Sequence, residues 1–242
     1  MITLEQNVRE IALEHPHSIR IFEGRGIDYC CGGRKPLAEA CVARNLSADD
    51  VLAALKLAEE STAPMAGEWQ HARLQDLIDH IVGSHHAYVK RELPRLAVLA
   101  QKVVNRHGDT QAHLPAIQNA LKELDGELTH HLAKEENILF PYIASLEAAM
   151  ESGGTLPDAC FGSVANPIAM MMSEHEAAGA ILAKIEQLSD GFTTPAGACP
   201  TYHALYDGLK EFQQDLRQHI HLENNILFPR AILFETSTGV AI

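Results

Sequence analysis

The sequence contains no run of 18 or more uniformly apolar residues, which a membrane-spanning helix would need. Its opening stretch, MITLEQNVRE, has neither the basic start nor the apolar middle of a secretory signal. Positive charge is also scarce, because 19 basic residues stand against 32 acidic ones, and the net charge of -13 repels phosphate backbones. We therefore expect a cytoplasmic protein with no nucleic acid and no membrane among its partners.

Cysteine pairs of the CxxC kind are absent, and the five cysteines form an odd number, so a disulfide framework is a poor interpretation. Strand signals are almost absent beyond residue 68, where apolar residues recur at spacings of three and four. With 46% hydrophobic residues over 242 positions, the chain can bury a sizeable core. These features predict an all-α protein.

The pattern of turn residues divides the chain into two domains. Residues 1–62 predict a small helical domain, in which the Gly-rich stretch GIDYCCGGRKP forms a loop between short helices. Residues 68–242 predict four long helical segments, at about 70–104, 114–150, 167–188 and 200–233. Pro94 should kink or strain the first of them. Short connections favour antiparallel neighbours, so the segments predict an up-down four-helix bundle.

An eleven-residue stretch occurs twice. HLAKEENILFP, at 131–141, returns as HIHLENNILFP at 219–229, and seven of the eleven positions are identical. The identical positions include a histidine and a glutamate four residues apart, His131 with Glu135 and His219 with Glu223. Residues at this spacing lie on one face of a helix. The two members of each pair therefore lie on the same face of their helix.

Polar residues interrupt an apolar stripe on all four predicted helices, where a core is expected. The stripes run through Ile78, Val82, His86, Val89, Leu93 and Leu96; through Leu124, Leu128, His131, Glu135, Ile138 and Tyr142; through Ile168, Met171, His175, Ala178, Leu182 and Ile185; and through Leu209, Phe212, Leu216, His219, Glu223 and Ile226. An ionised carboxylate in such a place needs a positive partner or loses its charge. The stripes thus predict buried groups that bind something cationic.

The arrangement predicts an internal duplication. His86 precedes His131 by 45 residues, and His175 precedes His219 by 44, so a helix with one histidine is followed twice by a helix with H-x-x-x-E. His130 and His221 are turned away from the stripes and should flank the site. His85 stays open as an alternative to His86, because an error of one residue in the stripe would exchange them.

Four histidines and two glutamates provide nitrogen and oxygen donors without thiolate, and they are too many for one tetrahedral zinc ion. Two carboxylates that can bridge suit two octahedral ions that share an oxo or hydroxo group, and this donor set favours iron or manganese. The residues therefore indicate a di-iron centre. The competing interpretation is a structural polar network, in which every donor and acceptor is satisfied within the core.

The order H…H-x-x-x-E…H…H-x-x-x-E resembles that of the hemerythrin-like di-iron bundles. The contexts HLAKEENILFP, SEHEAAG and HLENNILFPRA, with DYCCGG near the N-terminus, are similar to the iron-sulfur cluster repair di-iron proteins, the YtfE/ScdA or RIC family. The resemblance covers essentially the whole chain. It implies two non-haem iron ions bridged by Glu135 and Glu223, in a cytoplasmic protein made under nitrosative or oxidative stress.

The resemblance further implies a role in restoring damaged iron-sulfur clusters, either by donating iron or by reducing nitric oxide. The expected partners are damaged iron-sulfur proteins or apo-proteins, NO or O2 as a small ligand, and an unidentified electron donor. Cys30 and Cys31 match the family's paired cysteines, and we expect them to act as thiols in iron or NO transfer, since neighbouring cysteines form only a strained disulfide.

Two other functions compete with repair. The first is a hemerythrin-like protein that binds or senses O2 or NO without turnover. True O2 carriers of that kind usually have a fifth histidine and one carboxylate fewer, so two glutamates with four histidines favour redox chemistry or iron donation. The second is iron storage, for which the sequence shows no sign of a large shell assembly. Whether the protein is an NO-reducing enzyme or an iron donor is left open by the residues.

Overall fold

The computed structural model describes residues 2–30, 32–61 and 68–238. The chain separates into two compact units, of which the first is Met1–Arg73 together with Arg217–Arg230. Its N-terminal part contains four helices, α1 Val8–Glu14, α2 Ser18–Gly24, α3 Leu37–Ala43 and α4 Ala48–Ser61. They surround a core of apolar side chains that includes Ile11, Phe22, Leu37 and Leu55, each with no exposed surface.

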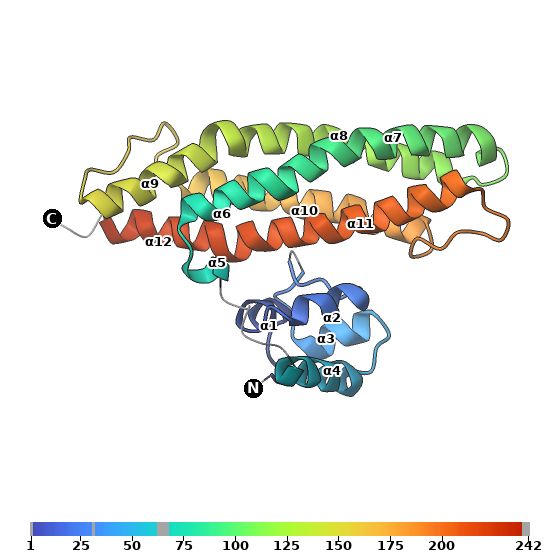
Figure 1. The fold of residues 1–242 in the computed structure, drawn as a ribbon, viewed down its shortest axis with the longest axis horizontal. Coiled ribbons are helices and arrows are strands. Elements are labelled where there is room, and N and C mark those ends of the chain that lie inside the picture. Colours follow the sequence, from blue (N-terminus) through green and yellow to red (C-terminus); the bar gives the residue numbers. More distant parts are fainter. Residues whose placement is uncertain (1, 31, 62–67, 239–242) are drawn as a thin grey trace. The chain divides into compact units, whose positions relative to one another are not determined.

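The second unit, Leu74–Leu216 with Ala231–Ile242, holds the long helical rods of a bundle, except for residues 217–230 of the last rod, which belong to the first unit. The rods of the bundle follow one another in alternating directions, as the chain can be followed in Figure 1. They are α6 Leu74–His80 with η1 Ile81–His86 and α7 Ala87–His107; α8 His113–Lys134 with η2 Glu135–Leu139 and α9 Phe140–Ser152; α10 Ala165–Leu188; and α11 Pro200–Leu222 with η3 Glu223–Leu227 and α12 Phe228–Thr238. A further short helix, α5 Glu68–His71, precedes the first rod.

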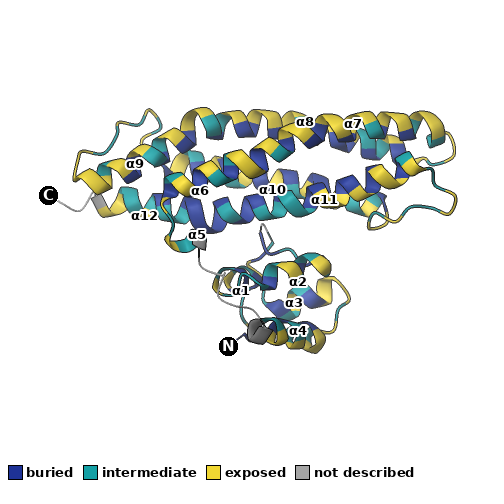
Figure 2. Cartoon of the chain, in the orientation of Figure 1, coloured by how far each residue is buried: buried dark blue, intermediate teal, exposed yellow. Residues whose placement is uncertain are grey.

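The rods pack through their apolar faces, and Figure 2 shows the buried residues on the sides that face the other rods. The Tyr88 ring of α7 stacks on the Phe212 ring of α11 with centroids 6.2 Å apart. Gln213 of α11 donates to Glu186 of α10 at 3.0 Å. Interlocking apolar side chains, worth about 25 cal/mol for each Å² of apolar area buried, hold such a bundle together.

The predicted all-α class is confirmed, because the described residues contain helices and no strand. The rods also begin and end close to the predicted bounds. Pro94 stands inside α7, which continues through it to His107. Among the described helices, none is both long and apolar enough to cross a membrane.

The duplication includes a second glutamate in each half, in addition to the predicted histidines and glutamates. Twelve residues after Glu135 lies Glu147, whose two oxygens accept hydrogen bonds from the backbone N–H groups of Leu74 and Gln75, at 2.6 and 3.0 Å, where α6 begins. Glu235 follows Glu223 at the same spacing. A carboxylate at a helix N-terminus satisfies N–H groups that have no partner within the helix.

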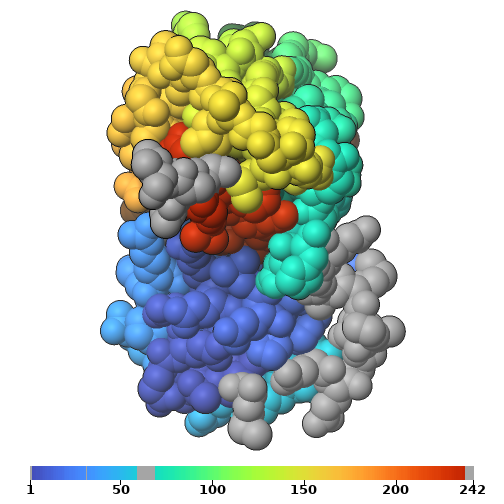
Figure 3. All heavy atoms as spheres, turned by 90° about the vertical axis from the view of Figure 1, so that its left-hand side faces the viewer, coloured from blue at the N-terminus to red at the C-terminus, as the bar shows by residue number. Residues whose placement is uncertain are grey.

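Glu235 has the corresponding role at the start of α10. Its oxygens accept from the backbone N–H of Val164 at 2.8 and 3.1 Å and from the Ser163 hydroxyl at 2.6 Å. The Tyr142 hydroxyl of α9 also donates to it, at 3.0 Å, at the end of the bundle where α9 and α12 lie side by side (Figure 3). Each half of the duplication therefore uses its second helix to cap its first.

Three turns of the rods are π-helical, η1, η2 and η3, and each begins or ends at a predicted ligand. Glu135 opens η2, Glu223 opens η3 and His86 closes η1. A π turn holds one residue more than an α turn and is rare, and it is frequently found at functional sites. The extra residue turns everything beyond it by about 100° around the helix axis.

The π turns correct part of the predicted stripes. Ile138 is 52% exposed and Tyr142 is half-buried, although both were expected to face inward. Leu139 and Ile143 take the buried places instead, one residue later. Val82, within η1, is half-buried, while Ile81 ahead of it is buried. The sequence pattern assumed an unbroken α-helical period, and that assumption fails by one residue at these turns.

Candidate metal centre

The two histidine–glutamate pairs lie inside the protein. His131 Nε2 is 3.4 Å from Glu135 Oε2, and His219 Nε2 is 2.8 Å from Glu223 Oε1. Neither glutamate has exposed surface, and the two histidines are at most 2% exposed. The spacing of four residues places both members of each pair on one helix face, as the sequence indicated.

The remaining two predicted histidines point toward these pairs. His86 Nε2 lies 3.5 Å from Glu135 Oε2, and His175 Nε2 lies 2.9 Å from His131 Nε2. The rings of His131 and His175 meet edge to face, with centroids 4.6 Å apart. Both of the added histidines are buried. Each histidine thus presents its Nε2 atom to the carboxylates.

The predicted residues gather into two groups in which the donor atoms all lie within 4.8 Å of one another. The groups are His86, Glu135, His219 and Glu223, and His131, Glu135, His175 and Glu223. Both glutamates belong to both groups. The structure therefore brings together all six of the predicted ligands, and two carboxylates stand where they can be shared.

His86 rather than His85 occupies the predicted place. His85 is buried as well, but its Nδ1 lies 3.0 Å from Asp215 Oδ1 of α11, and it is in neither group. The two neighbours differ by about 100° around the helix, which decides which of them faces the carboxylates.

The donors suit a cation. Two imidazole nitrogens at about 2.1 Å from one divalent ion, and at right angles to each other, lie about 3 Å apart. The Nε2 atoms of His131 and His175 are separated by 2.9 Å. Buried carboxylates also need positive charge close by, since removing an ion from water costs several kcal/mol. Nitrogen and oxygen donors of this kind are typical of a metal-binding site, and of iron in particular.

Two glutamates that the sequence analysis did not single out contact the outer nitrogens of the site. Glu136 meets His86, and Glu174 meets His131. Burial works to raise the pKa of Glu136, but hydrogen bonds from Lys90 and His86 outweigh it and hold the pKa below its usual value. The pKa of Glu174 is likewise lowered against the effect of burial. The only feature of the sequence that could have indicated these two glutamates is their position: Glu136 follows Glu135, and Glu174 precedes His175.

Comparisons with known proteins agree with this geometry. Residues 77–231 match the family model described as the hemerythrin HHE cation binding domain. The chain is 37% identical over 229 residues to an iron-sulfur cluster repair protein YtfE of Pectobacterium atrosepticum, across 94% of this chain and 97% of that protein. The chain belongs to the YtfE family. A protein of the same name from Escherichia coli O81 is 38% identical over 232 residues, across 96% of this chain and 98% of that protein.

The family extends to the N-terminal part of the chain. Residues 4–59 match the ScdA_N model, described as a domain of unknown function (DUF542). The resemblance that the ligand order and the DYCCGG stretch indicated is therefore confirmed, and the fold class with it. The hemerythrin match covers the rods that carry the six donors, so a hemerythrin-like metal-binding domain is the correct description of the bundle.

Of the two predicted thiols, Cys30 lies in the loop between α2 and α3. Cys30 is buried, and the Oδ1 atom of Asp28 accepts from its backbone N–H at 3.0 Å and lies 3.2 Å from its Sγ. Cys31 falls outside the described residues. Cys41 belongs to the apolar core of the first unit, as a structural cysteine would. A role of Cys30 and Cys31 in transfer remains a prediction.

The two histidines expected beside the site differ from each other. His130 is exposed on α8. His221 is buried, its Nδ1 accepts a hydrogen bond from the Asn225 side chain at 2.7 Å, and burial, aided by the charge of Arg9, lowers its pKa to about 4. His221 is therefore a neutral hydrogen-bonded residue at neutral pH.

Proposed function

We propose that the chain is a di-iron protein that takes part in the repair of iron-sulfur clusters damaged by nitrosative or oxidative stress, in the cytoplasm. The observation that carries the proposal is the pair of four-residue donor groups that share Glu135 and Glu223. Two relatives, 37% and 38% identical over 94% and 96% of this chain, are named for iron-sulfur cluster repair. The family thus supports the process, and the donor groups support the cofactor.

The two groups support a division of the ligands between two ions. His86 and His219 would hold one ion, His131 and His175 the other, and both glutamates would bridge them. A bound pair of non-haem iron ions with an oxo or hydroxo bridge supplies electrons and open positions for a small ligand. The protein contributes buried donor side chains held by the helices, and two carboxylates that favour the cations.

Two activities are compatible with this site. In iron donation, the protein would release iron to an apo-protein or a damaged cluster, because a site whose ligands can be protonated is reversible. In NO reduction, two NO molecules, two electrons and two protons yield N2O and water, with the electrons restored by an electron donor. Binding or sensing of O2 or NO without turnover is the alternative, and the donor set of four histidines and two glutamates disfavours it.

One experiment separates these activities. The protein is loaded with iron anaerobically, and its iron content and visible spectrum are measured before and after addition of NO, while N2O is measured in the gas phase. A parallel sample receives an apo-ferredoxin, and iron transfer is followed by cluster absorbance. About two irons per chain are expected, with either N2O or a restored cluster.

The possible results separate as follows. N2O in proportion to NO supports reduction, and a restored ferredoxin without N2O supports donation. A changed spectrum with neither product supports binding without turnover. One zinc ion per chain, with no iron retained, contradicts the proposed centre. Glu223→Gln serves as the matched variant, because it keeps the size of a shared ligand and removes its charge, and it should bring iron content well below two per chain.

A further inference from the structure

A lysine–glutamate pair stands behind His86, on the side away from the shared carboxylates. Glu136 Oε1 lies 2.7 Å from His86 Nδ1 and 2.6 Å from Lys90 Nζ, and Glu136 Oε2 lies 2.7 Å from the same Nζ. His86 and Lys90 lie one helical turn apart, across η1 and α7, while Glu136 belongs to η2 of the next rod. The Glu136 carboxylate therefore accepts hydrogen bonds from both His86 and Lys90.

The same construction recurs at a second predicted ligand. Glu174 Oε2 of α10 lies 2.8 Å from His131 Nδ1, and the Lys134 ammonium contacts the other oxygen of the carboxylate. Lys134 again shares a helix with its histidine, and the glutamate again comes from a neighbouring rod. Two instances in one bundle, each on the nitrogen opposite the metal-facing one, make a chance surface ion pair a poor explanation.

We propose that Glu136, held by Lys90, is a positioning residue for His86, and that Glu174, held by Lys134, is one for His131. The inference rests on the proposed di-iron centre. An imidazole has one N–H when neutral, and a carboxylate at Nδ1 fixes the hydrogen there, so the Nε2 lone pair faces the donor group. The carboxylate also fixes the ring plane and raises the basicity of the ligand nitrogen.

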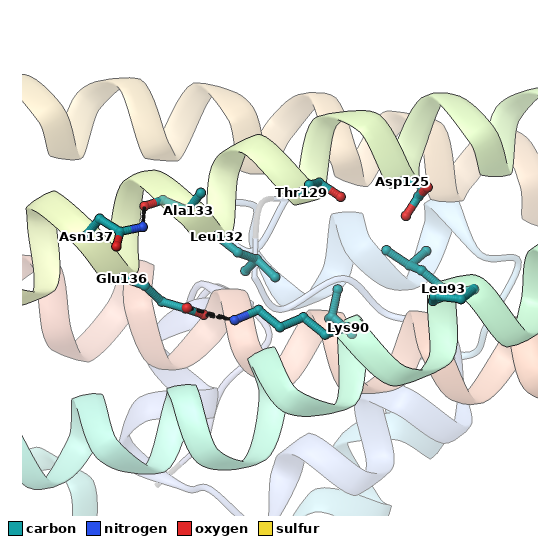
Figure 4. Close-up of a pocket in the computed structure, with 10 residues that line it drawn as sticks. Lys90, Leu93, Asp125, Thr129, Leu132, Ala133, Glu136 and Asn137 are labelled. Carbon is teal, nitrogen blue, oxygen red and sulfur yellow. Dashed lines mark hydrogen bonds and ion pairs between the residues drawn. The ribbon is translucent and has the colours of Figure 1, made fainter.

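The lysine acts from the solvent side. Lys90 and Glu136 line a cavity of about 240 Å³ between α7 and α8, and Figure 4 shows the two side chains joined to each other, with Leu132 and Leu93 among the other lining residues. The Lys90 side chain is 54% exposed, whereas His86 has no exposed surface. Lys90 therefore fixes the carboxylate without itself being removed from water, and its contribution should be smaller than that of Glu136.

The test measures iron binding rather than activity. Iron affinity and the rate of iron loss to a chelator are determined for the wild type and for Glu136→Gln, with the visible spectrum of the loaded protein as a second readout. We expect a loss of affinity of about 10–100-fold, faster release and a shifted spectrum. Lys90→Met should have a smaller effect in the same direction, and Lys90→Arg should restore the wild-type values.

Glu92→Gln is the matched control. Glu92 is a buried carboxylate of the same rod, hydrogen-bonded by Arg91 and Arg95 rather than by a ligand. The Glu92→Gln substitution should reduce the melting temperature of the metal-free protein while leaving its iron affinity unchanged. Wild-type iron affinity in Glu136→Gln, or an equal loss in Glu92→Gln, overturns the inference. If the wild type itself retains no iron, the proposed function fails, which the variants alone would not show.

Discussion

The helix caps that the duplication provides give a quantitative prediction for Glu147. Its carboxylate accepts two backbone hydrogen bonds at the start of α6 and is 5% exposed. In Glu147→Gln an NH2 group, which cannot accept, replaces one carboxylate oxygen, so one of the two N–H groups loses its acceptor and the other keeps only a neutral one. A hydrogen bond to a charged group contributes about 1.5–3 kcal/mol. We expect the free energy of unfolding to fall by about 2 kcal/mol.

A loss of that size lowers the melting temperature of a protein of this length by about 4–8 °C, because one kcal/mol corresponds to about 2–4 °C. Thermal and urea unfolding of the metal-free protein measure it, and faster hydrogen exchange at Leu74 and Gln75 would locate it. Glu151→Gln, an exposed carboxylate of the same helix, is the control and should change little. Equal stability of Glu147→Gln and the wild type, with unchanged exchange, would refute the reasoning.

Three further predictions concern the register of the site, the π turns and acid stability. His86→Gln should remove most of the bound iron, while His85→Gln should leave about two irons per chain by metal analysis. Deletion of the exposed Ile138 should convert η2 into an α turn and keep the bundle folded by circular dichroism, yet reduce iron content, because Glu135 would be displaced; deletion within the regular part of α9 should unfold the protein instead. Burial works to raise the pKa of Glu92, but hydrogen bonds from Arg95 and Arg91 outweigh it and hold the pKa below 4.5. The ionised Glu92 carboxylate therefore stabilises the fold above pH 4.5, and this stabilisation is lost as the pH falls through the folded-state pKa. The difference in unfolding free energy between the metal-free wild type and Glu92→Gln should shrink in acid.

The convergence of the six predicted residues could be foreseen from the sequence because helix geometry is local. His131 and Glu135 share a face whatever surrounds them, and the repeat supplied the same pair again at His219 and Glu223. The third rod illustrates this, since every residue of its predicted stripe, His175 among them, is buried. A period of three and four along an unbroken α-helix is enough for such a prediction.

The π turns and the capping glutamates could not be predicted in that way. A π turn inserts one residue without any composition signal, so Ile138 was assigned to the core and Leu139 was not. Glu147 is a core carboxylate only because the start of another helix approaches it, and that approach is a tertiary fact. The sequence pattern did not distinguish Glu136 from an ordinary surface carboxylate. Contacts between rods, rather than patterns within them, decide the roles of Glu147 and Glu136.

Each donor group takes two residues from the first helix pair and two from the second, and this has a consequence for ancestry. One helix pair alone offers two histidines and one glutamate, which complete neither group. Two copies of such a pair related by a twofold axis would complete both, since a symmetric association presents every residue twice. The present chain then corresponds to two joined copies of one helix pair, and its two donor groups occupy places that such a twofold axis would make equivalent.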